Sequence, residues 1–381
     1  MNSGPGGSGQ VRADGSDAFH GKPTLAVVGA TGAVGSVLRG LLSERENVWG
    51  EIRLIASARS AGTKLTLRGE QVEVLALTEE ALDGADVVLL HVPDEVAAQW
   101  APIAASKGAV VVDSSAAFRT DPDVPLVVPE INGHTARVRP RGVIANPDCV
   151  TLAMIVAVGA LHSEWGLDEL IMSSYQAVSG SGTEGVRVLR EQLALVAGTE
   201  LGTKPGDVRR AVSRTVPFPA PIALNVVPFA GELAADGWTS EEQRLRDETR
   251  KVLDLPRLRV VATCVRVPVI TGHSLSVHAR FESEVSVGAA HEILANAPGV
   301  VLCDDPAEGS SRRPPTWWAP TRRGWGGCGA RRTIRGRWSS SSAATTSARA
   351  RRSIRCKSPR PSYPGTESEA GGGPRPVVKE L

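Results

Sequence analysis

The stretch Thr24-Leu25-Ala26-Val27-Val28-Gly29-Ala30-Thr31-Gly32-Ala33-Val34-Gly35 decides the fold of this chain. A short β-forming run leads into a glycine-rich turn, and the helical pattern Ser36–Leu42 follows. Glycines at such a turn permit a tight bend and close backbone approach, while the helix N-terminus offers N–H groups to a pyrophosphate. Many glycine patterns are ordinary strand–helix turns, but this context favours a dinucleotide site. We predict that the cofactor contacts Gly29, Thr31, Gly32, Ala33, Val34 and Gly35.

The same alternation continues along the chain. Ile52–Ala56, Asp86–Leu90 and Ala109–Asp113 are typical of buried strands, and helical stretches lie between them. Strands that alternate with helices predict a doubly wound parallel sheet in the α/β class. We therefore expect a Rossmann-type domain.

The residues after the strand Ile52–Ala56 bear on the choice of cofactor. NAD-preferring sites usually carry an acid there for the ribose 2′-OH. This chain has Ser57, Arg59 and Ser60 instead. Hydroxyls and a guanidinium suit a 2′-phosphate, which predicts NADP. A solvated basic turn is the alternative.

Composition limits the other classes of function. The chain has 381 residues, enough for two domains, and a formal net charge of +2. Its five cysteines form no CxxC pair, which fits a reducing, cytoplasmic setting and argues against a structural zinc site. No apolar run reaches the ~18 residues of a membrane helix. The Gly/Ser-rich segment 1–22 is predicted to be a disordered tail rather than a secretory signal.

Cys149 is the candidate nucleophile. It follows Asn146-Pro147-Asp148 and opens the apolar helical stretch Val150–Leu161. The dipole at a helix N-terminus stabilises a thiolate. A lone cysteine is more often a small buried apolar residue, so the case depends on a base elsewhere in the chain.

Two further motifs make the pattern specific: Ser173-Ser174-Tyr175-Gln176-Ala177-Val178-Ser179-Gly180-Ser181-Gly182 and Arg266-Val267-Pro268-Val269-Ile270-Thr271-Gly272-His273-Ser274. With them, residues 24–306 resemble the bacterial aspartate-β-semialdehyde dehydrogenases. The resemblance implies an NADP domain over residues 23–149, and an α+β catalytic and dimerisation domain over residues 150–309. It also implies a homodimer that reduces aspartyl phosphate to the semialdehyde, in lysine, threonine and methionine biosynthesis.

The resemblance assigns roles to individual residues. Cys149 matches the nucleophile, His273 the acid/base, and Gln176 the residue that orients the acyl intermediate. Ser179 and Gly180 match cofactor contacts. A packed core histidine and a polar strand end are the alternatives for His273 and Gln176.

Four charged residues match substrate contacts. Arg266 matches the partner of the α-carboxylate, and Glu241 the partner of the amino group. Arg119 and Arg244 match the cations for inorganic phosphate. A surface salt bridge is the alternative for Glu241.

Several positions depart from the family pattern. Asp148 stands where Asn is usual, Val150 where Ser or Thr is usual, and Arg244 where Lys is usual. Asp113-Ser114-Ser115-Ala116 replaces Asp-Asn-Ser-Ser, and His91-Val92-Pro93-Asp94 replaces a small turn near the nicotinamide. These departures predict weak or altered activity, or an inactive paralogue. An N-acetyl-glutamyl-phosphate type of reductase is a further alternative.

The tail, residues 310–381, holds 16 basic and 3 acidic side chains and shows no helical or strand period. The family has there a segment like Val-Cys-Gly-Asp-Asn-Leu-Arg-Lys-Gly-Ala-Ala-Leu. GC-rich codons for that segment, read one base late, encode Ser-Ala-Ala-Thr-Thr-Ser-Ala-Arg-Ala-Arg-Arg, the sequence of residues 342–352. We predict a single frameshift near Glu308–Gly309, which is either a sequencing error or a real lesion in the gene. The basic charge is then a by-product of codon composition, and we expect neither nucleic-acid nor membrane binding.

Overall fold

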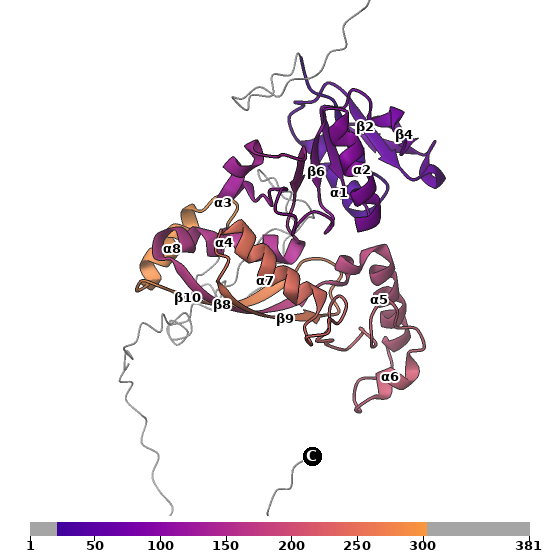
Figure 1. Ribbon diagram of the computed structural model, residues 1–381. Helices are drawn as coiled ribbons and strands as arrows, with labels where there is room; N and C mark the ends of the chain where they lie inside the picture. Colours follow the sequence, from indigo (N-terminus) through magenta and orange to yellow (C-terminus); the bar gives the residue numbers. More distant parts are fainter. Residues whose placement is uncertain (1–20, 303–381) are drawn as a thin grey trace, which may run out of the picture.

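The computed structural model describes residues 21–302. Most of the predicted N-terminal tail and all of the predicted frameshifted tail lie outside these residues. Figure 1 shows two units that meet at the start of α4 (Cys149–Trp165).

The first unit is built on a seven-stranded sheet of order β3-β4-β2-β1-β5-β6-β7. Its strands are β1 (Leu25–Val28), β2 (Ile52–Ala56), β3 (Lys64–Leu67), β4 (Glu70–Ala76), β5 (Val87–Leu90), β6 (Val110–Asp113) and β7 (Val143–Ala145). The four strands expected from the sequence are confirmed to within a residue at each end. A wholly parallel sheet was wrong at one edge, where β3 pairs antiparallel with β4 because Arg68 and Gly69, at φ 55° and 83°, make a tight hairpin.

Alternate residues of β1 serve two cores, which is why the strand is apolar throughout. Leu25 and Val27 belong to the core beside α1 (Ala33–Glu44), and Ala26 and Val28 belong to the main core beside α2 (Asp94–Ser106). Helices thus cover both faces of the sheet, and the α/β class is confirmed. Short helical turns complete this unit: η1 (Ala58–Ser60), η2 (Glu80–Leu82), α3 (Pro129–Asn132) and η3 (Gly133–Arg137).

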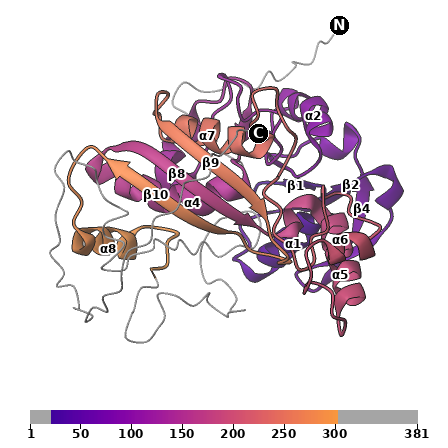
Figure 2. The ribbon, with the colours of Figure 1, turned by 90° about the horizontal axis from the view of Figure 1, so that it is seen from below.

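The second unit is organised around α4. Eleven of the 17 residues of α4 are buried, so this helix is a core element on all sides. It packs against a three-stranded sheet of order β10-β8-β9 and against three helices, one of which is α3 of the first unit. The elements are β8 (Leu167–Gln176), β9 (Arg259–Arg266), β10 (Ser274–Phe281), α7 (Ser240–Val252) and α8 (Val287–Asn296). Figure 2 shows α4 and α7 on the same face of this sheet.

A smaller core lies under the excursion between β8 and α7. There η4 (Val178–Ser181), α5 (Gly182–Val196) and α6 (Asp207–Ala211) enclose a separate apolar cluster that includes Val188, Leu189, Phe218 and Ile222. Within residues 21–302, no helix combines the length and the apolar character needed to cross a membrane.

Candidate active site

Cys149 lies at the first position of α4, as the sequence predicted. Its Sγ is 3.2 Å from Nε2 of His273, a residue 124 positions away that immediately precedes β10. The helix N-terminus and an imidazole therefore converge on one sulfur atom. This arrangement stabilises a thiolate, the reactive form of cysteine.

The tautomer of His273 follows from its second hydrogen bond. The backbone N–H of Ala177 donates to Nδ1 at 3.1 Å, so in the neutral ring the proton resides on Nε2, the nitrogen that faces the sulfur. Burial lowers the pKa of His273; the charge of Asp148 opposes this shift and that of Arg266 adds to it. The ring is therefore neutral at pH 7, with an N–H directed at Cys149.

Asp148 caps the same helix. Its carboxylate accepts the Val150 N–H at 2.9 Å and lies 3.7 Å from Cys149 Sγ. The carboxylate is also 3.6 Å from Nη1 of Arg119. The cap stabilises the helix start, but it places a negative charge beside the thiol and beside a candidate phosphate ligand.

Arg119 is 8% exposed and is held mainly by a residue that no sequence motif indicated, Glu248 of α7. Its Nη1 lies 3.0 Å from Glu248 Oε1, and its Nη2 donates to the Ser114 carbonyl at 2.8 Å. Burial opposes the charge of the guanidinium, but Glu248 and Asp148 outweigh it and raise the pKa of Arg119. Among the described residues, nothing accepts a hydrogen bond from its buried Nε.

Glu248 also reaches α4, the helix that begins at Cys149. Its Oε2 accepts the Asp148 N–H at 2.7 Å and the Thr151 hydroxyl at 2.8 Å. Burial raises the pKa of Glu248 to about 7, although Arg119 favours the charged form. We assign the carboxylate form at neutral pH, because both oxygens face hydrogen-bond donors.

Arg266 and Gln176 end neighbouring strands. Arg266 is 7% exposed and donates to the Ala177 carbonyl at 3.1 Å. A Cβ on Gly180 would come within 2.5 Å of Arg266 Nη1, so a larger residue there would displace this guanidinium. Gln176 is buried, and its amide donates to Ser174 at 3.0 Å. The structure therefore places both residues beside Ala177, the residue that orients His273.

Glu241 and Arg244 lie one turn apart on α7 and form an ion pair at 3.1 Å. Burial raises the pKa of Glu241, and the charge of Asp148 adds to this shift, while Arg244, Arg266 and Arg119 oppose it. Glu241 is therefore within electrostatic reach of the thiol site, and its ion pair is only partly a surface contact.

The glycine-rich turn brings its backbone close to neighbouring groups. Gly29 has φ +92°, and a Cβ there would meet the His91 carbonyl oxygen at 2.1 Å. A Cβ on Gly35 would meet the Gly29 carbonyl oxygen at 2.4 Å. No side chain caps α1 at Gly32, so the first N–H groups of this helix remain available. Thr31 and Ala33 are exposed and Val34 is partly buried at this opening.

Comparisons with known proteins agree with this geometry. The model of the semialdehyde dehydrogenase NAD-binding domain matches residues 24–138, and that of the semialdehyde dehydrogenase dimerisation domain matches residues 158–321. The aspartate-semialdehyde dehydrogenase of Corynebacterium glutamicum is 47% identical over 288 residues, which span 74% of this chain and 84% of the relative. The Aquifex aeolicus enzyme is 40% identical over 284 residues, spanning 74% and 81%.

A solved structure is also similar. The crystal structure of aspartate semialdehyde dehydrogenase II from Vibrio cholerae superposes with a TM-score of 0.67 at 36% identity, and covers 72% of this chain and 79% of that one. The chain belongs to the aspartate-semialdehyde dehydrogenase family. The resemblance drawn from the Cys149, Gln176 and His273 motifs is thereby confirmed.

The turn after β5, where His91-Val92-Pro93-Asp94 stands, is held by hydrogen bonds to two neighbouring segments. The His91 N–H donates to Val28 at 3.0 Å, and Asp94 accepts the Ala116 N–H at 2.8 Å. Burial lowers the pKa of His91, and the charge of Arg119 adds to that shift. This turn is thus packed into the domain, between the glycine-rich turn and the loop after β6.

Ser57, Arg59 and Ser60 follow β2, and Arg59 and Ser60 lie in η1. Ser57 and Arg59 are exposed and Ser60 is partly buried. Ser179 and Gly180 lie in η4, whose backbone is joined to Ile270 by the Ser179 N–H at 3.1 Å. No described contact links η1 to the thiol site.

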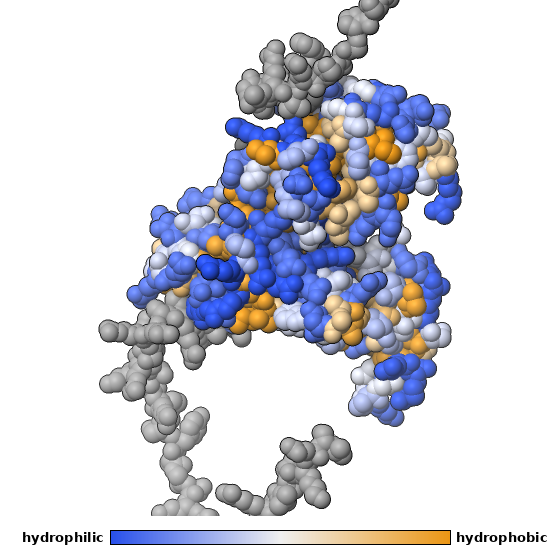
Figure 3. All heavy atoms as spheres, in the orientation of Figure 1, coloured by the Kyte–Doolittle hydropathy of each residue, from blue (hydrophilic) through white to orange (hydrophobic). Residues whose placement is uncertain are grey.

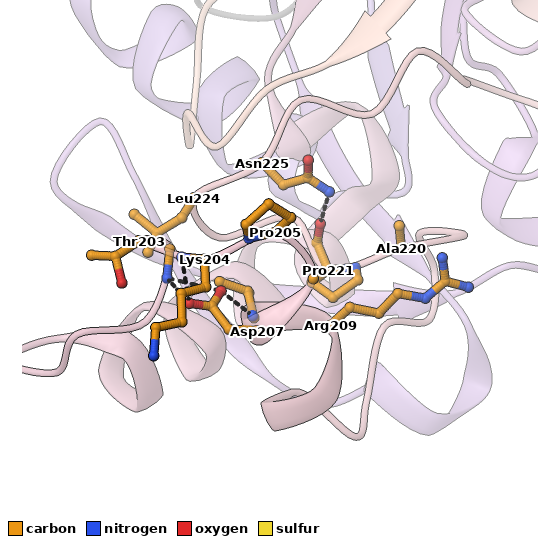
Figure 4. Close-up of a pocket in the computed structure, with 12 residues that line it drawn as sticks. Thr203, Lys204, Pro205, Asp207, Arg209, Ala220, Pro221, Leu224 and Asn225 are labelled. Carbon is orange, nitrogen blue, oxygen red and sulfur yellow. Dashed lines mark hydrogen bonds between the residues drawn. The ribbon is translucent and has the colours of Figure 1, made fainter.

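A surface hollow of about 470 Å³ opens elsewhere, between the loops around α6. Figure 4 shows Thr203, Lys204, Asp207 and Arg209 among its lining residues. It contains none of the predicted site residues. Asp207 turns inward to accept the Gly202 and Lys204 N–H groups, so the loop satisfies its own polar groups.

Glu248 and Lys251, two of the four charged residues along one face of α7, were not among the residues that the sequence predicted. Glu241, Arg244, Glu248 and Lys251 recur at intervals of three and four residues, which places them on one side of a helix. That spacing was a usable signal for Glu248 and Lys251. Ala177, by contrast, acts through its backbone N–H, so its side chain gave no indication of this role.

Proposed function

We propose that this chain catalyses the reversible, NADP-dependent conversion of aspartyl phosphate to aspartate semialdehyde through a thioester on Cys149. The observation that supports this most directly is the 3.2 Å contact between Cys149 Sγ and His273 Nε2 at the N-terminus of a buried helix. An aldehyde dehydrogenase of this kind needs a sulfur nucleophile with a proton donor beside it. The Vibrio cholerae homologue has also been crystallised with the semialdehyde, at 35% identity to this chain.

In the reductive direction the Cys149 thiolate attacks the acyl carbon, the carbon–oxygen bond to phosphate breaks, and a thioester forms. The nicotinamide, when bound, supplies the hydride. Negative charge then develops on the former carbonyl oxygen, where His273 acts as acid and base: it shares its Nε2 proton with that oxygen. The carbon–sulfur bond breaks to release the aldehyde, the thiolate re-forms, and the proton is again held by Nε2. Gln176 orients the acyl group.

Four side chains are proposed to hold the substrate. Arg266 binds the α-carboxylate and Glu241 the amino group. Arg119 and Arg244 bind phosphate. The buried Nε of Arg119, without a hydrogen-bond partner in the described part of the chain, leaves a donor open for an anion.

The cofactor is proposed to be NADP. The turn Gly29–Gly35 and the uncapped start of α1 would hold the pyrophosphate. Ser57, Arg59 and Ser60 would hold the 2′-phosphate, because β2 ends without the carboxylate that suits a free 2′-OH. Ser179 and Gly180 would face the nicotinamide half.

The test is a coupled pair of assays on the full chain. NADPH formation is followed with phosphate and aspartate semialdehyde, and in parallel with phosphate and N-acetyl-glutamate semialdehyde. We expect phosphate-dependent turnover with the first aldehyde alone, and none in Cys149→Ser. Turnover with the acetylated substrate, or activity retained in Cys149→Ser, would reject the proposal. The relatives named above favour the aspartate substrate.

We further propose a cytoplasmic homodimer formed through the outer face of the three-stranded sheet. The matched family model describes a dimerisation domain. Ile171, Tyr175 and Val261 are 45%, 42% and 45% exposed on the face opposite α4 and α7. A cluster of large apolar side chains at the centre of a sheet favours burial against a second copy. Ile171→Glu should yield monomers in sedimentation experiments.

The residues after Gly309 are proposed to come from a shifted reading frame. Resequencing the gene around codon 309 tests this directly, since the alternative frame must encode the family's segment. If it does not, the basic residues 310–381 belong to the protein and the proposal fails.

A further inference from the structure

We infer that Glu248 and Lys251 of α7 are positioning residues for Arg119, and that together they hold this arginine in the orientation that binds phosphate. The inference rests on the proposed role of Arg119 in phosphate binding. Neither residue belongs to a motif that indicated the site, and neither is proposed to touch substrate.

Lys251 fixes the backbone that carries Arg119. Its Nζ donates to the carbonyls of Arg119, Asp121 and Val124 at 2.9, 2.6 and 2.8 Å. Three acceptors use all three protons of the ammonium group, so the loop after β6 is tied to α7 at three points. Burial lowers the pKa of Lys251, and the charge of Asp121 opposes this shift.

Glu248 fixes the side chain. Its two oxygens have different partners. Oε1 faces Arg119 Nη1 at 3.0 Å. Oε2 accepts hydrogen bonds from the Asp148 N–H at 2.7 Å and from the Thr151 hydroxyl at 2.8 Å. The carboxylate is 2% exposed, so solvent does not weaken these bonds. Arg119 is thus drawn toward α7, and Asp148 at 3.6 Å remains the more distant carboxylate.

The two contacts join two units of the fold. Arg119 and its loop belong to the nucleotide-binding unit, whereas Glu248 and Lys251 belong to the second unit. Polar residues gather over α7 in Figure 3, yet these two turn inward, where Glu248 is buried and Lys251 only partly exposed. The arrangement sets the distance between the phosphate ligand and Cys149, because Glu248 also binds the first turn of the nucleophile's helix.

The substitution Glu248→Gln distinguishes the roles of the two carboxylate oxygens. The amide oxygen can keep the Asp148 and Thr151 bonds, but the amide NH2 would face the Arg119 guanidinium, donor against donor. We expect Arg119 to leave this position and close on Asp148. Lys251→Met keeps the length of the side chain and removes all three bonds to the loop.

The experiment measures the dissociation constant of inorganic phosphate by calorimetry on the full chain. We expect it to rise at least tenfold in Glu248→Gln and in Lys251→Met. The KM for the aldehyde and the NADP dissociation constant should stay within twofold.

Two matched controls remove bonds of equal kind. Thr151→Val deletes a hydroxyl bond to Glu248 without touching Arg119. Arg250→Met deletes a cation-to-carbonyl bond on the same helix, from Arg250 to Leu258 at 2.9 Å. Both variants should keep the wild-type dissociation constant for phosphate. If Lys251→Met does not fold, Lys251→Arg replaces it, since a guanidinium cannot serve three carbonyls from one nitrogen.

The outcomes separate this inference from the proposed function. If the wild type binds phosphate and both variants have the same phosphate dissociation constant as the wild type, the inference is overturned but the proposed function is not. Tighter phosphate binding in Glu248→Gln would have the same consequence. A lower melting temperature with unchanged phosphate affinity would mean that the two residues have a merely structural role, and it would also overturn the inference. A wild type that neither binds nor uses phosphate rejects the proposed role of Arg119.

Discussion

The glycine-rich turn of residues 29–35 and the Cys149 centre are built in opposite ways. The turn uses consecutive residues, and its function depends on backbone groups and on missing side chains. The Cys149 centre brings together side chains as far as 129 positions apart, and charges within it act on one another. A site of the first kind is sensitive to volume, whereas a site of the second kind is sensitive to charge and protonation. Four substitutions test that contrast.

The largest expected effect is at His273. We expect His273→Asn to lower kcat by about 10² to 10⁴, the range of a lost acid or base. Burial lowers the pKa of His273 below its ordinary 6.5, so the neutral ring persists above that pH and is lost only below it. Wild-type activity should therefore fall as the pH drops below 6.5. This acid limb of the pH–rate profile should be absent in the variant. A pH–rate profile with the same acid limb in both proteins would contradict the assignment.

The next effect is at Gly29, where volume alone is changed. Gly29→Ala places a methyl group 2.1 Å from the His91 carbonyl oxygen, at φ +92°. Left-handed backbone costs an L-residue about 1–2 kcal/mol, before any clash. We expect NADP to bind about 30-fold more weakly by fluorescence titration.

Gly40→Ala, on α1 beyond the turn, is the matched control for this change. A Cβ on Gly40 would meet no atom within 4 Å. NADP affinity should change little in this variant. Equal losses in the two alanine variants would show that the turn does not work through backbone shape.

The contrast also explains what the sequence could reveal. The turn and four strands of its sheet follow from local apolar runs and glycine spacing, so they were predicted within a residue or so. Cys149 at a helix start was local too, and His273 required a family resemblance because nothing local joins it to Cys149. Glu248 and Lys251 were missed, since their partners on the Arg119 loop lie about 130 residues earlier. The antiparallel β3 was missed because a hairpin at Arg68–Gly69 carries a weak turn signal.

A smaller effect is expected at Arg59, which tests the cofactor side without altering the turn. Arg59 is exposed in η1 at the end of β2. A hydrogen bond to a charged group contributes about 1.5–3 kcal/mol. We expect Arg59→Ala to raise the KM for NADP at least about tenfold and to leave the KM for NAD unchanged. If the KM values for NADP and NAD rise equally, Arg59 does not bind the 2′-phosphate.

The smallest expected effect is at Asp148, where one charge changes and shape does not. Asn keeps an oxygen for the Val150 N–H at 2.9 Å, so the cap of α4 survives. It removes the negative charge 3.7 Å from Cys149 Sγ and 3.6 Å from Arg119. A unit charge about 4 Å away is worth about 1 kcal/mol in a water-like medium, or roughly fivefold in rate.

We therefore expect Asp148→Asn to raise turnover about fivefold and to lower the KM for phosphate, because Arg119 loses a competing anion. The gain is limited, since Glu248 remains the nearer partner of Arg119 at 3.0 Å. The rate of Cys149 alkylation by iodoacetamide, followed by mass spectrometry of its peptide, gives a second readout and should rise as well. Cys264 serves as the internal control, because burial raises the pKa of its thiol to about 12 and keeps it unreactive. Equal or lower turnover in the Asn variant across pH 6–9 would mean that Arg119 already neutralises Asp148, and that the charge beside Cys149 does not limit the turnover of this protein.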